Sequence, residues 1–391
     1  MAQAPSLMDD HVEEILLRFP PEDPGSLLNA ALVSKTWRRI VSGPGFNRRF
    51  SEFHRQRASP PPVLGFFCGI ATPSDTYSDP GETGFMPLLP SFCRLPHAFM
   101  PSWRAVNARH GRVLFYDKHD MVLVKPKSVR LHLIVWNPIT GEVWRLPLAP
   151  ISTPMDRLEL KQGWSAALLC DHADGSFQVA LLATDEGVTS ACVYSSEQHA
   201  WGVPISAQLH PFLRLMRGPN VLIGNALYFK CQNSTILEYD MSKQDLSLIS
   251  LPAEGRRKSI ALMTAEEGGL GFAVVLNSEL YTWSREVGLD GDGRWAQQRV
   301  YSLHNLLPSS QLSHRRVTAR VVAAENACSF VFITTCIGIF IIDLKFGRVR
   351  KIYELSYDRD ILAIVPYASF CTPVTCLTPH EAKFFGSGLY K

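Results

Sequence analysis

Residues 133–147 read LIVWNPITGEVWRLP, and this stretch indicates the architecture of most of the chain. Its first four residues are apolar, its middle is Asn-Pro-Ile-Thr-Gly, and the apolar residues Val143 and Trp144 follow. Runs of β-branched and aromatic residues that flank a turn with Pro and Gly are typical of a β-hairpin. The stretch therefore predicts two antiparallel strands joined by a short turn.

Hairpin-like segments of the same kind recur along the chain, with centres about 45 to 60 residues apart. They begin at Ala191, Thr235, Glu279 and Gly338, and further apolar runs lie between them at Gly111, Ser176, Asn225, Leu270 and Cys328. Each interval thus holds about four short strands, which is the repeat of a β-propeller. Residues 63–391 have room for about six or seven such blades. A β-sandwich or an irregular barrel is the competing all-β architecture.

The first fifty residues differ from the rest because their apolar residues follow a helical period. Val12, Ile15, Leu16 and Phe19 lie on one face of a predicted first helix, and Asp10 is placed to begin it. Two further helices follow from capping signals. Their boundaries are given by Asp23-Pro24 at the second start, Ser34 at the third start and the break at residues 43–45.

These patterns predict three segments: a three-helix domain over residues 1–50, a basic and Pro-rich linker over 51–62, and the all-β domain over 63–391. A three-helix unit of this size buries a very small core. An apolar surface left on it is therefore interpreted as a docking surface for a partner.

Composition narrows the class of protein. The net charge of +3 over 391 residues gives no reason to expect a nucleic-acid or membrane-surface protein. The nine cysteines are odd in number and form no CxxC pair, so reduced and mostly buried thiols are expected. The N-terminus shows no signal peptide, and the longest uncharged apolar stretch, residues 327–342, reads as two strands and a turn. These features predict an intracellular protein of the cytoplasm, the nucleus or both.

Motifs for metal or nucleotide chemistry are weak, and no cofactor or metal is expected. Cys371, Cys376 and His380 lack a fourth zinc ligand, and GLDGDGR from Gly288 breaks the calcium-loop pattern after Asp292. No phosphate-binding Gly loop leads into a helix, and no nucleophile elbow or HExxH motif occurs. Catalysis by the propeller remains open only as an alternative.

Basic residues around Trp37 raise the alternative of nucleic-acid binding. Lys35, Arg38 and Arg39 lie on the helical face opposite Trp37, and acidic residues of the first two helices nearly balance them. The charges are therefore interpreted as a solvated face. The apolar side that carries Trp37 is the more informative one, because a tryptophan is large for so small a unit to bury.

The sequence LMDDHVEEILLRFPPEDPGSLLNAALVSKTWRRIVSGPGF, which starts at Leu7, resembles the F-box. The matching features are Leu7, Ile15-Leu16, Pro20, a Leu-rich second helix, Val-Ser-Lys-x-Trp-Arg from Val33, and Pro44-Gly45-Phe46. Met8 departs from the family pattern, where Pro is usual, and Phe19 stands where Leu is common. The β-rich remainder resembles the F-box-associated, kelch-like region of plant F-box proteins, chiefly through VWNPITGEVWRLP from Val135.

This resemblance implies a substrate adaptor of an SCF-type cullin-RING ubiquitin ligase. The helices would dock to the Skp-family linker protein and through it to a cullin, and the propeller would hold a protein substrate without performing chemistry. The residues expected to contact the linker are Leu7, Met8, Ile15, Leu16, Pro20, Leu28, Val33, Trp37 and Ile40. The alternative is a stand-alone propeller, either a binding protein or a hydrolase, whose N-terminal helices form a cap.

Overall fold

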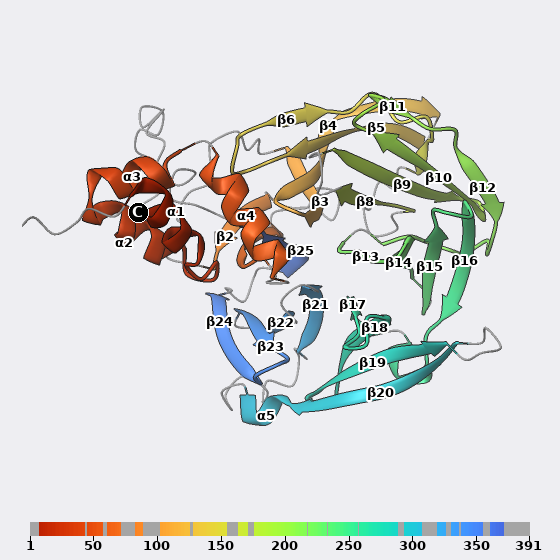
Figure 1. Ribbon diagram of the computed structural model, residues 1–391. Coiled ribbons are helices and arrows are strands. Elements are labelled where there is room, and N and C mark those ends of the chain that lie inside the picture. Colours follow the sequence, from red (N-terminus) through yellow and green to blue (C-terminus); the bar gives the residue numbers. More distant parts are fainter. Residues whose placement is uncertain are drawn as a thin grey trace, which may run out of the picture.

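The computed structural model describes most of the chain. The described residues are 8–43, 45–57, 61–71, 83–88, 102–125, 128–154, 163–170, 176–216, 218–232, 234–256, 258–287, 293–306, 319–325, 330–335, 338–354 and 360–370. Figure 1 shows a group of helices beside a ring of small β-sheets. No helix among the described residues is both long and apolar enough to cross a membrane.

Four helices, which we call the helical unit, precede the ring: α1 (Asp9–Leu17), α2 (Pro24–Val33), α3 (Lys35–Val41) and α4 (Phe46–Gln56). The expected count of three is therefore too low. The fourth helix extends through residues 51–56, which the sequence had placed in a linker. Its aromatic side chains Phe46, Phe50 and His54 recur at every fourth position and are buried on one side. The many charged residues between them conceal this stripe.

Two of the three helix starts form as predicted. The Asp23 side chain accepts a hydrogen bond from Gly25 N at 3.1 Å, and the Ser34 side chain accepts one from Trp37 N at 3.1 Å. The first helix differs from expectation, because it begins at Asp9 and its N-cap residue Met8 makes no side-chain cap. Asp10 therefore lies inside the helix.

The ring is a β-propeller with six blades, which settles the expected six or seven. Five blades follow one another along the chain. Blade 2 contains β3 (Trp103–Arg109), β4 (Arg112–Lys125), β5 (Ser128–Trp136), β6 (Val143–Arg145) and β7 (Thr153–Pro154). Blade 3 contains β8 (Trp164–Cys170), β9 (Phe177–Asp185), β10 (Val188–Ser195), β11 (Ala200–Trp201) and β12 (Ile205–Gln208). Blade 4 contains β13 (Val221–Ile223), β14 (Ala226–Lys230), β15 (Thr235–Asp240) and β16 (Asp245–Ser250).

Blade 5 contains β17 (Ile260–Thr264), β18 (Leu270–Leu276), β19 (Glu279–Val287) and β20 (Gly293–Ser302), and blade 6 contains β21 (Arg320–Glu325), β22 (Phe330–Thr335), β23 (Gly338–Asp343) and β24 (Arg348–Glu354). Two short helices lie between blades: η1 (Ala253–Gly255) and α5 (Leu303–Leu306). The apolar stretch 327–342 contributes β22 and β23, as predicted.

Blade 1 closes the ring by joining the two ends of the β-rich region. It contains β1 (Val63–Ala71), β2 (Thr83–Pro87) and β25 (Asp360–Ala368) in the order β2-β1-β25. Strand β25 pairs antiparallel with β1, so that Phe67 faces Val365 and Cys68 faces Ile364. The pairing of these two strands within one blade closes the ring.

The core of the propeller lies between blades rather than inside any one of them. Six clusters of buried apolar residues each combine side chains from two neighbouring blades. Successive residues of a strand point to opposite faces, so one strand serves two clusters. On β25, for example, Ile364 packs toward blade 6 and Val365 packs toward blade 2.

Polar side chains also join blades near the inner strands. Asn107 on β3 accepts a hydrogen bond from Leu168 N at 3.0 Å, and Asn220 donates one to Ala166 O at 2.9 Å. The two asparagines bond to each other at 3.4 Å, which ties blades 2, 3 and 4 together. Lys230 on blade 4 donates to the carbonyl of Ile260 on blade 5 at 3.0 Å, and burial lowers its pKa to about 8.

Candidate partner-docking site

Exposed apolar side chains are concentrated on the helical unit. Of the ten large hydrophobic residues that are exposed among the described residues, four lie in α1, α2 or the N-cap of α1. They are Met8 at 66% exposure, Ile15 at 42%, Leu32 at 75% and Val33 at 70%. Met8 and Ile15 are seven residues apart and therefore share one side of α1. Such a surface is typical of a protein-docking site.

The buried core of the helical unit explains why these residues are left outside. It is built from Val12, Leu16, Leu27, Ala30, Val41, Phe46, Phe50 and Phe370. On α2, the buried side is formed by Leu27, Ala30 and Ala31. Leu32 lies about 100° around the helix from Ala31, away from this side. Leu32 is not among the residues that the sequence predicted to contact a partner. Its helical phase relative to Ala31 is the signal that marks it as exposed.

The residues predicted to contact a partner separate into three groups. Met8, Ile15 and Val33 are exposed, as is Pro20. Trp37 and Ile40 are half-buried, because they pack against the core of the helical unit.

Leu16 is fully buried in that core, so its side chain holds the helices together and does not face outward. Leu7 and the side chain of Leu28 lie outside the described residues.

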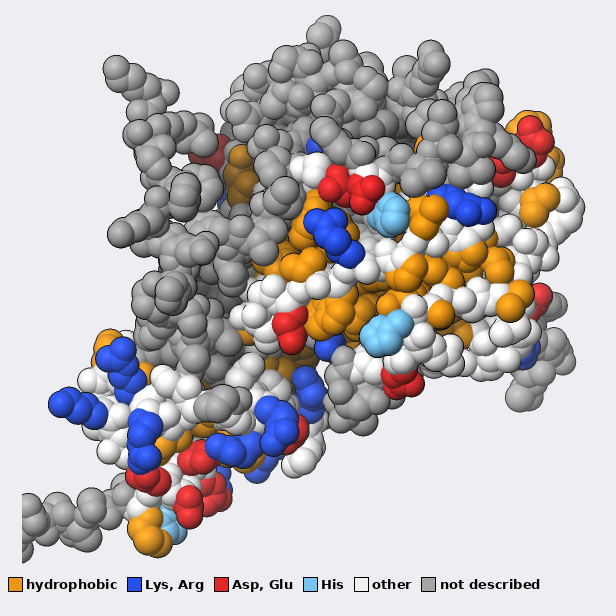
Figure 2. All heavy atoms as spheres, turned by 90° about the horizontal axis from the view of Figure 1, so that it is seen from above, with side chains coloured by type: hydrophobic (Ala, Val, Ile, Leu, Met, Phe, Trp, Pro, Cys, Tyr) orange, Lys and Arg blue, Asp and Glu red, His pale blue; other side chains and the backbone are white. Residues whose placement is uncertain are grey.

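Most of the acidic residues of α1 are paired with arginines of the unit. Asp9 binds Arg39, Glu13 binds Arg49, and Glu14 binds Arg18 at 2.6 Å. Figure 2 shows the same intermixing of basic and acidic side chains over the helical unit. Exposed pairs of this kind contribute little to stability, but they offset part of the positive charge that a nucleic-acid reader would need.

A second apolar surface lies on the outside of blades 2 and 3. Figure 2 shows hydrophobic side chains gathered over β6, β11 and β12, the part of the ring at the top of Figure 1. Separately, the large hydrophobic residues that are exposed on or next to the strands of blades 2 and 3 are Val143 on β6, Val188 on β10, Val203 after β11 and Phe212 after β12. Val203 is 91% exposed, which is the highest value among the exposed large hydrophobic residues.

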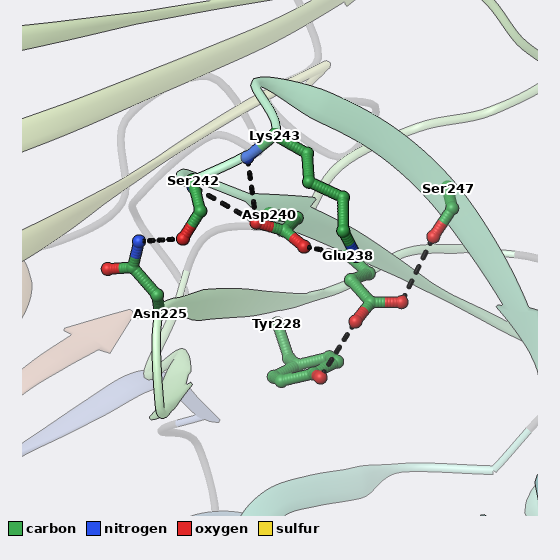
Figure 3. Close-up of polar contacts among 7 residues, drawn as sticks. All are labelled: Asn225, Tyr228, Glu238, Asp240, Ser242, Lys243 and Ser247. Atoms are coloured by element: carbon green, nitrogen blue, oxygen red, sulfur yellow. Dashed lines mark hydrogen bonds and ion pairs between the residues drawn. The ribbon is translucent and has the colours of Figure 1, made fainter.

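The carboxylate of Glu238 in blade 4 has a structural role. Glu238 on β15 accepts hydrogen bonds from Tyr228 at 2.8 Å and from Ser247 at 3.0 Å, across the three strands of Figure 3. Burial, followed by the bond to Glu238, raises the pKa of Tyr228. Glu238 thus joins β14 and β16 and offers no free carboxylate.

The neighbouring Asp240 organises the turn between β15 and β16. Its carboxylate accepts the backbone N–H groups of Ser242 and Lys243 at 3.0 and 3.1 Å and pairs with the Lys243 ammonium at 2.9 Å (Figure 3). The hydrogen bond to Lys243 lowers the pKa of Asp240. Asp343 holds the equivalent turn of blade 6 in the same way, accepting from Lys345 N and Phe346 N.

Metal binding finds no support in the part of the chain that the structure describes. Within that part, no three His, Cys, Asp or Glu side chains come together to hold an ion. The candidates noted in the sequence, namely Cys371, Cys376 and His380 and the loop from Gly288, lie outside the described residues.

Comparison with known proteins gives two family matches. The family described as "F-box protein AT5G49610-like, beta-propeller" matches residues 106–374, and the F-box domain matches residues 6–49. No curated protein matches the chain. Neither family is catalytic by its description.

Solved structures with a similar course of the chain include three other proteins. The WD40 domain of SCAP from fission yeast is 13% identical with a TM-score of 0.34, and the match covers 67% of this chain and 58% of that one. Apo AztD from Citrobacter koseri is 10% identical with a TM-score of 0.36, covering 78% and 98%. Dipeptidyl peptidase 4 from Porphyromonas gingivalis is 10% identical with a TM-score of 0.31, covering 73% and 52%. The chain thus spans little more than half the length of the first and third of these proteins.

Proposed function

The chain belongs to the family of F-box proteins with an AT5G49610-like β-propeller, and we propose that it is the substrate adaptor of an SCF-type cullin-RING ubiquitin ligase. The helical unit docks to a Skp-family linker, which connects it to a cullin. The propeller holds a target protein near the ubiquitin-conjugating enzyme. The adaptor acts by raising the local concentration of the target and contributes no catalytic group.

One observation carries this proposal: the exposed apolar residues of the helical unit coincide with the segment that matches the F-box. Met8, Ile15 and Val33 are exposed, although the unit has its own core. Burying three or four such side chains against a partner provides the hydrophobic centre that stable interfaces have. We propose that these three residues and Leu32 contact the linker directly. Trp37 and Ile40 support them from below, and Leu16 keeps the helices in place.

Target binding is proposed for the propeller, whose outer surface on blades 2 and 3 exposes Val143, Val203 and Phe212. Binding at this surface is compatible with linker docking, because the two sets of residues lie on different units of the protein. Co-purification of bound proteins with the ligase activity blocked would identify the target.

The decisive experiment is a binding measurement between the purified full-length chain and a Skp-family linker protein. We expect a stable one-to-one complex. A wild-type chain that is folded by circular dichroism but does not bind the linker would refute the adaptor function.

A cap of the propeller is the second candidate function of the helices. It is favoured by one observation, the burial of Phe370 from the end of the propeller among the helices. Deleting the helices would destabilise the propeller under either function, so deletion does not separate them. Linker binding does, because a cap has no reason to bind the linker.

A further inference from the structure

Four consecutive residues connect the closing strand of the ring to the helical unit. Tyr367 is fully buried between blades 1 and 2, and its hydroxyl donates to Gly111 O at 3.2 Å. Ser369 N donates to Pro62 O at 3.1 Å, beside the start of β1. Phe370 then leaves the propeller and places its ring among the helices, where it is 5% exposed. The segment therefore passes from one core directly into another.

Phe370 is a full member of the core of the helical unit. Its ring stacks on His54 of α4, with ring centroids 6.1 Å apart and planes at 22°, and the Arg55 guanidinium lies 5.9 Å from its centroid. The His54 ring in turn packs against the Phe50 ring, with ring centroids 4.4 Å apart. Within the described residues, Phe370 is the one member of this core that the first fifty-seven residues do not supply.

This placement has an energetic consequence. A helical unit of this size is marginally stable alone, so one large buried ring is a considerable part of its core. Phe370 reaches that core only when β25 is paired with β1, since only Ser369 separates it from the end of the strand. Opening of the ring therefore withdraws a core residue from the helices. Free energies coupled in this way act in both directions.

We propose that Phe370 makes folding of the docking helices conditional on closure of the propeller, and that linker binding in return stabilises the closed ring. The second half rests on the proposed function. The device acts as a check on assembly: a chain whose propeller has not closed presents poorly folded helices and does not enter the ligase.

The first test does not involve the linker. Amide hydrogen exchange is measured on the full-length chain, with Leu16→Ala loosening the helical core from α1. We expect Leu16→Ala to speed exchange of the β1 and β25 amides about tenfold, with little change on β14 and β15 of blade 4. When Leu16→Ala is added to Phe370→Ala, the β1 and β25 amides should exchange at the same rates as in Phe370→Ala alone. Equal effects in both backgrounds would overturn the proposal.

The second test adds a Skp-family linker protein. Linker binding should slow exchange of β1 and β25 about tenfold in the wild type, by a smaller factor in Phe370→Leu, which keeps an apolar side chain in the core but loses the stack on His54, and not at all in Phe370→Ala. Binding without any slowing in the wild type would overturn the reciprocal coupling. A wild type that does not bind refutes the adaptor function alone, because the first test still decides whether Phe370 couples the two units. If Phe370→Ala does not fold, Phe370→Leu replaces it in the first test. The effect of Leu16→Ala on exchange of β1 and β25 should then be smaller in the Phe370→Leu background than in the wild type. An equal effect in the two backgrounds would contradict the proposal.

Discussion

The Trp295 indole on β20 donates a hydrogen bond to the backbone carbonyl of Ser250 at the end of β16, over 2.8 Å. Trp201 on β11 makes the corresponding bond to the carbonyl of Pro147, also over 2.8 Å. Each indole thus ties the outer strand of one blade to the chain leaving the blade before it. A Leu-Pro dipeptide lies at or directly after each acceptor. The Trp and Leu-Pro that recur in the sequence are therefore two sides of one contact between blades.

Removal of the indole N–H should weaken the propeller modestly. Trp295→Phe keeps an aromatic ring against Phe272, which it now meets at 5.0 Å, but leaves the Ser250 carbonyl without its donor. We expect the free energy of unfolding in urea to fall by about 1 kcal/mol. The control is Gln297→Ala, at an exposed position on the same strand. This substitution should change the free energy of unfolding by less than about 0.5 kcal/mol. Equal stabilities of the two variants would contradict the role of the bond.

A charge on the exposed end of α2 should block linker docking. Val33→Asp would bury an unpaired carboxylate in the proposed interface, and we expect linker binding to weaken by about 2 kcal/mol or more in calorimetry. Because Val33 is 70% exposed, the melting temperature should hardly change. The matched control is Val203→Asp on the propeller, which should bind the linker like the wild type. Unaltered binding by Val33→Asp would remove this residue from the interface.

The pairing of β1 with β2 in blade 1 leaves no space for a side chain at Gly65. A Cβ atom there would lie 2.5 Å from the Met86 carbonyl and would also strike the Phe85 ring of β2. Gly65→Ala should therefore reduce the free energy of unfolding by about 1–3 kcal/mol. Gly84→Ala on β2 is the control, because its Cβ would meet only the Met86 methyl at 3.6 Å. A Gly65→Ala protein as stable as Gly84→Ala would show that β1 and β2 separate easily.

The helical unit should lose stability in mild acid through His54. Burial holds the pKa of His54 below its ordinary value of 6.5, although the Leu17 and Phe19 carbonyls and Glu22 oppose the shift and Arg57 adds to it. The unfolded chain then binds the proton more readily than the folded one. The contribution of His54 to the free energy of unfolding is fully present above about pH 7. It decreases as the pH falls below 6.5 toward the lowered pKa of His54 in the folded protein.

His54→Phe should abolish this loss while keeping the stack on Phe370. Thermal unfolding between pH 7.5 and about 5 measures it, with His11→Phe, at an exposed position of α1, as the control that retains the acid loss. The same loss of stability in His54→Phe and the wild type would assign it to other groups.

Three cysteines should resist alkylation in the folded protein. Burial raises the pKa of Cys68, Cys192 and Cys231 to about 12 each, so almost no thiolate is present at pH 8. We expect iodoacetamide to label their peptides in urea but not in buffer, as read by mass spectrometry. Rapid labelling in buffer would show that the clusters between blades open often.

The local features of this protein follow from short segments of sequence. Asp23 and Ser34 begin their helices, and the turns at Asp240 and Asp343 form hairpins, because each of these interactions joins residues at most three positions apart. Strand alternation and the repeat length also indicated a propeller. The fourth helix was missed because charged residues interrupt its apolar stripe. Leu16 was expected to contact the linker from the resemblance to the F-box, and the structure shows its side chain in the core of the helical unit, which helical phase alone does not decide.

The amino-acid sequence was therefore sufficient for the hairpins, most of the helices and the class of architecture, all of which depend on neighbours in the chain. The number of blades, the pairing of β25 with β1, and the burial of Phe370 against His54 required the folded structure. These contacts join residues some three hundred positions apart, where no local preference acts. They form only because closing the ring and filling the helical core remove the same segment from water.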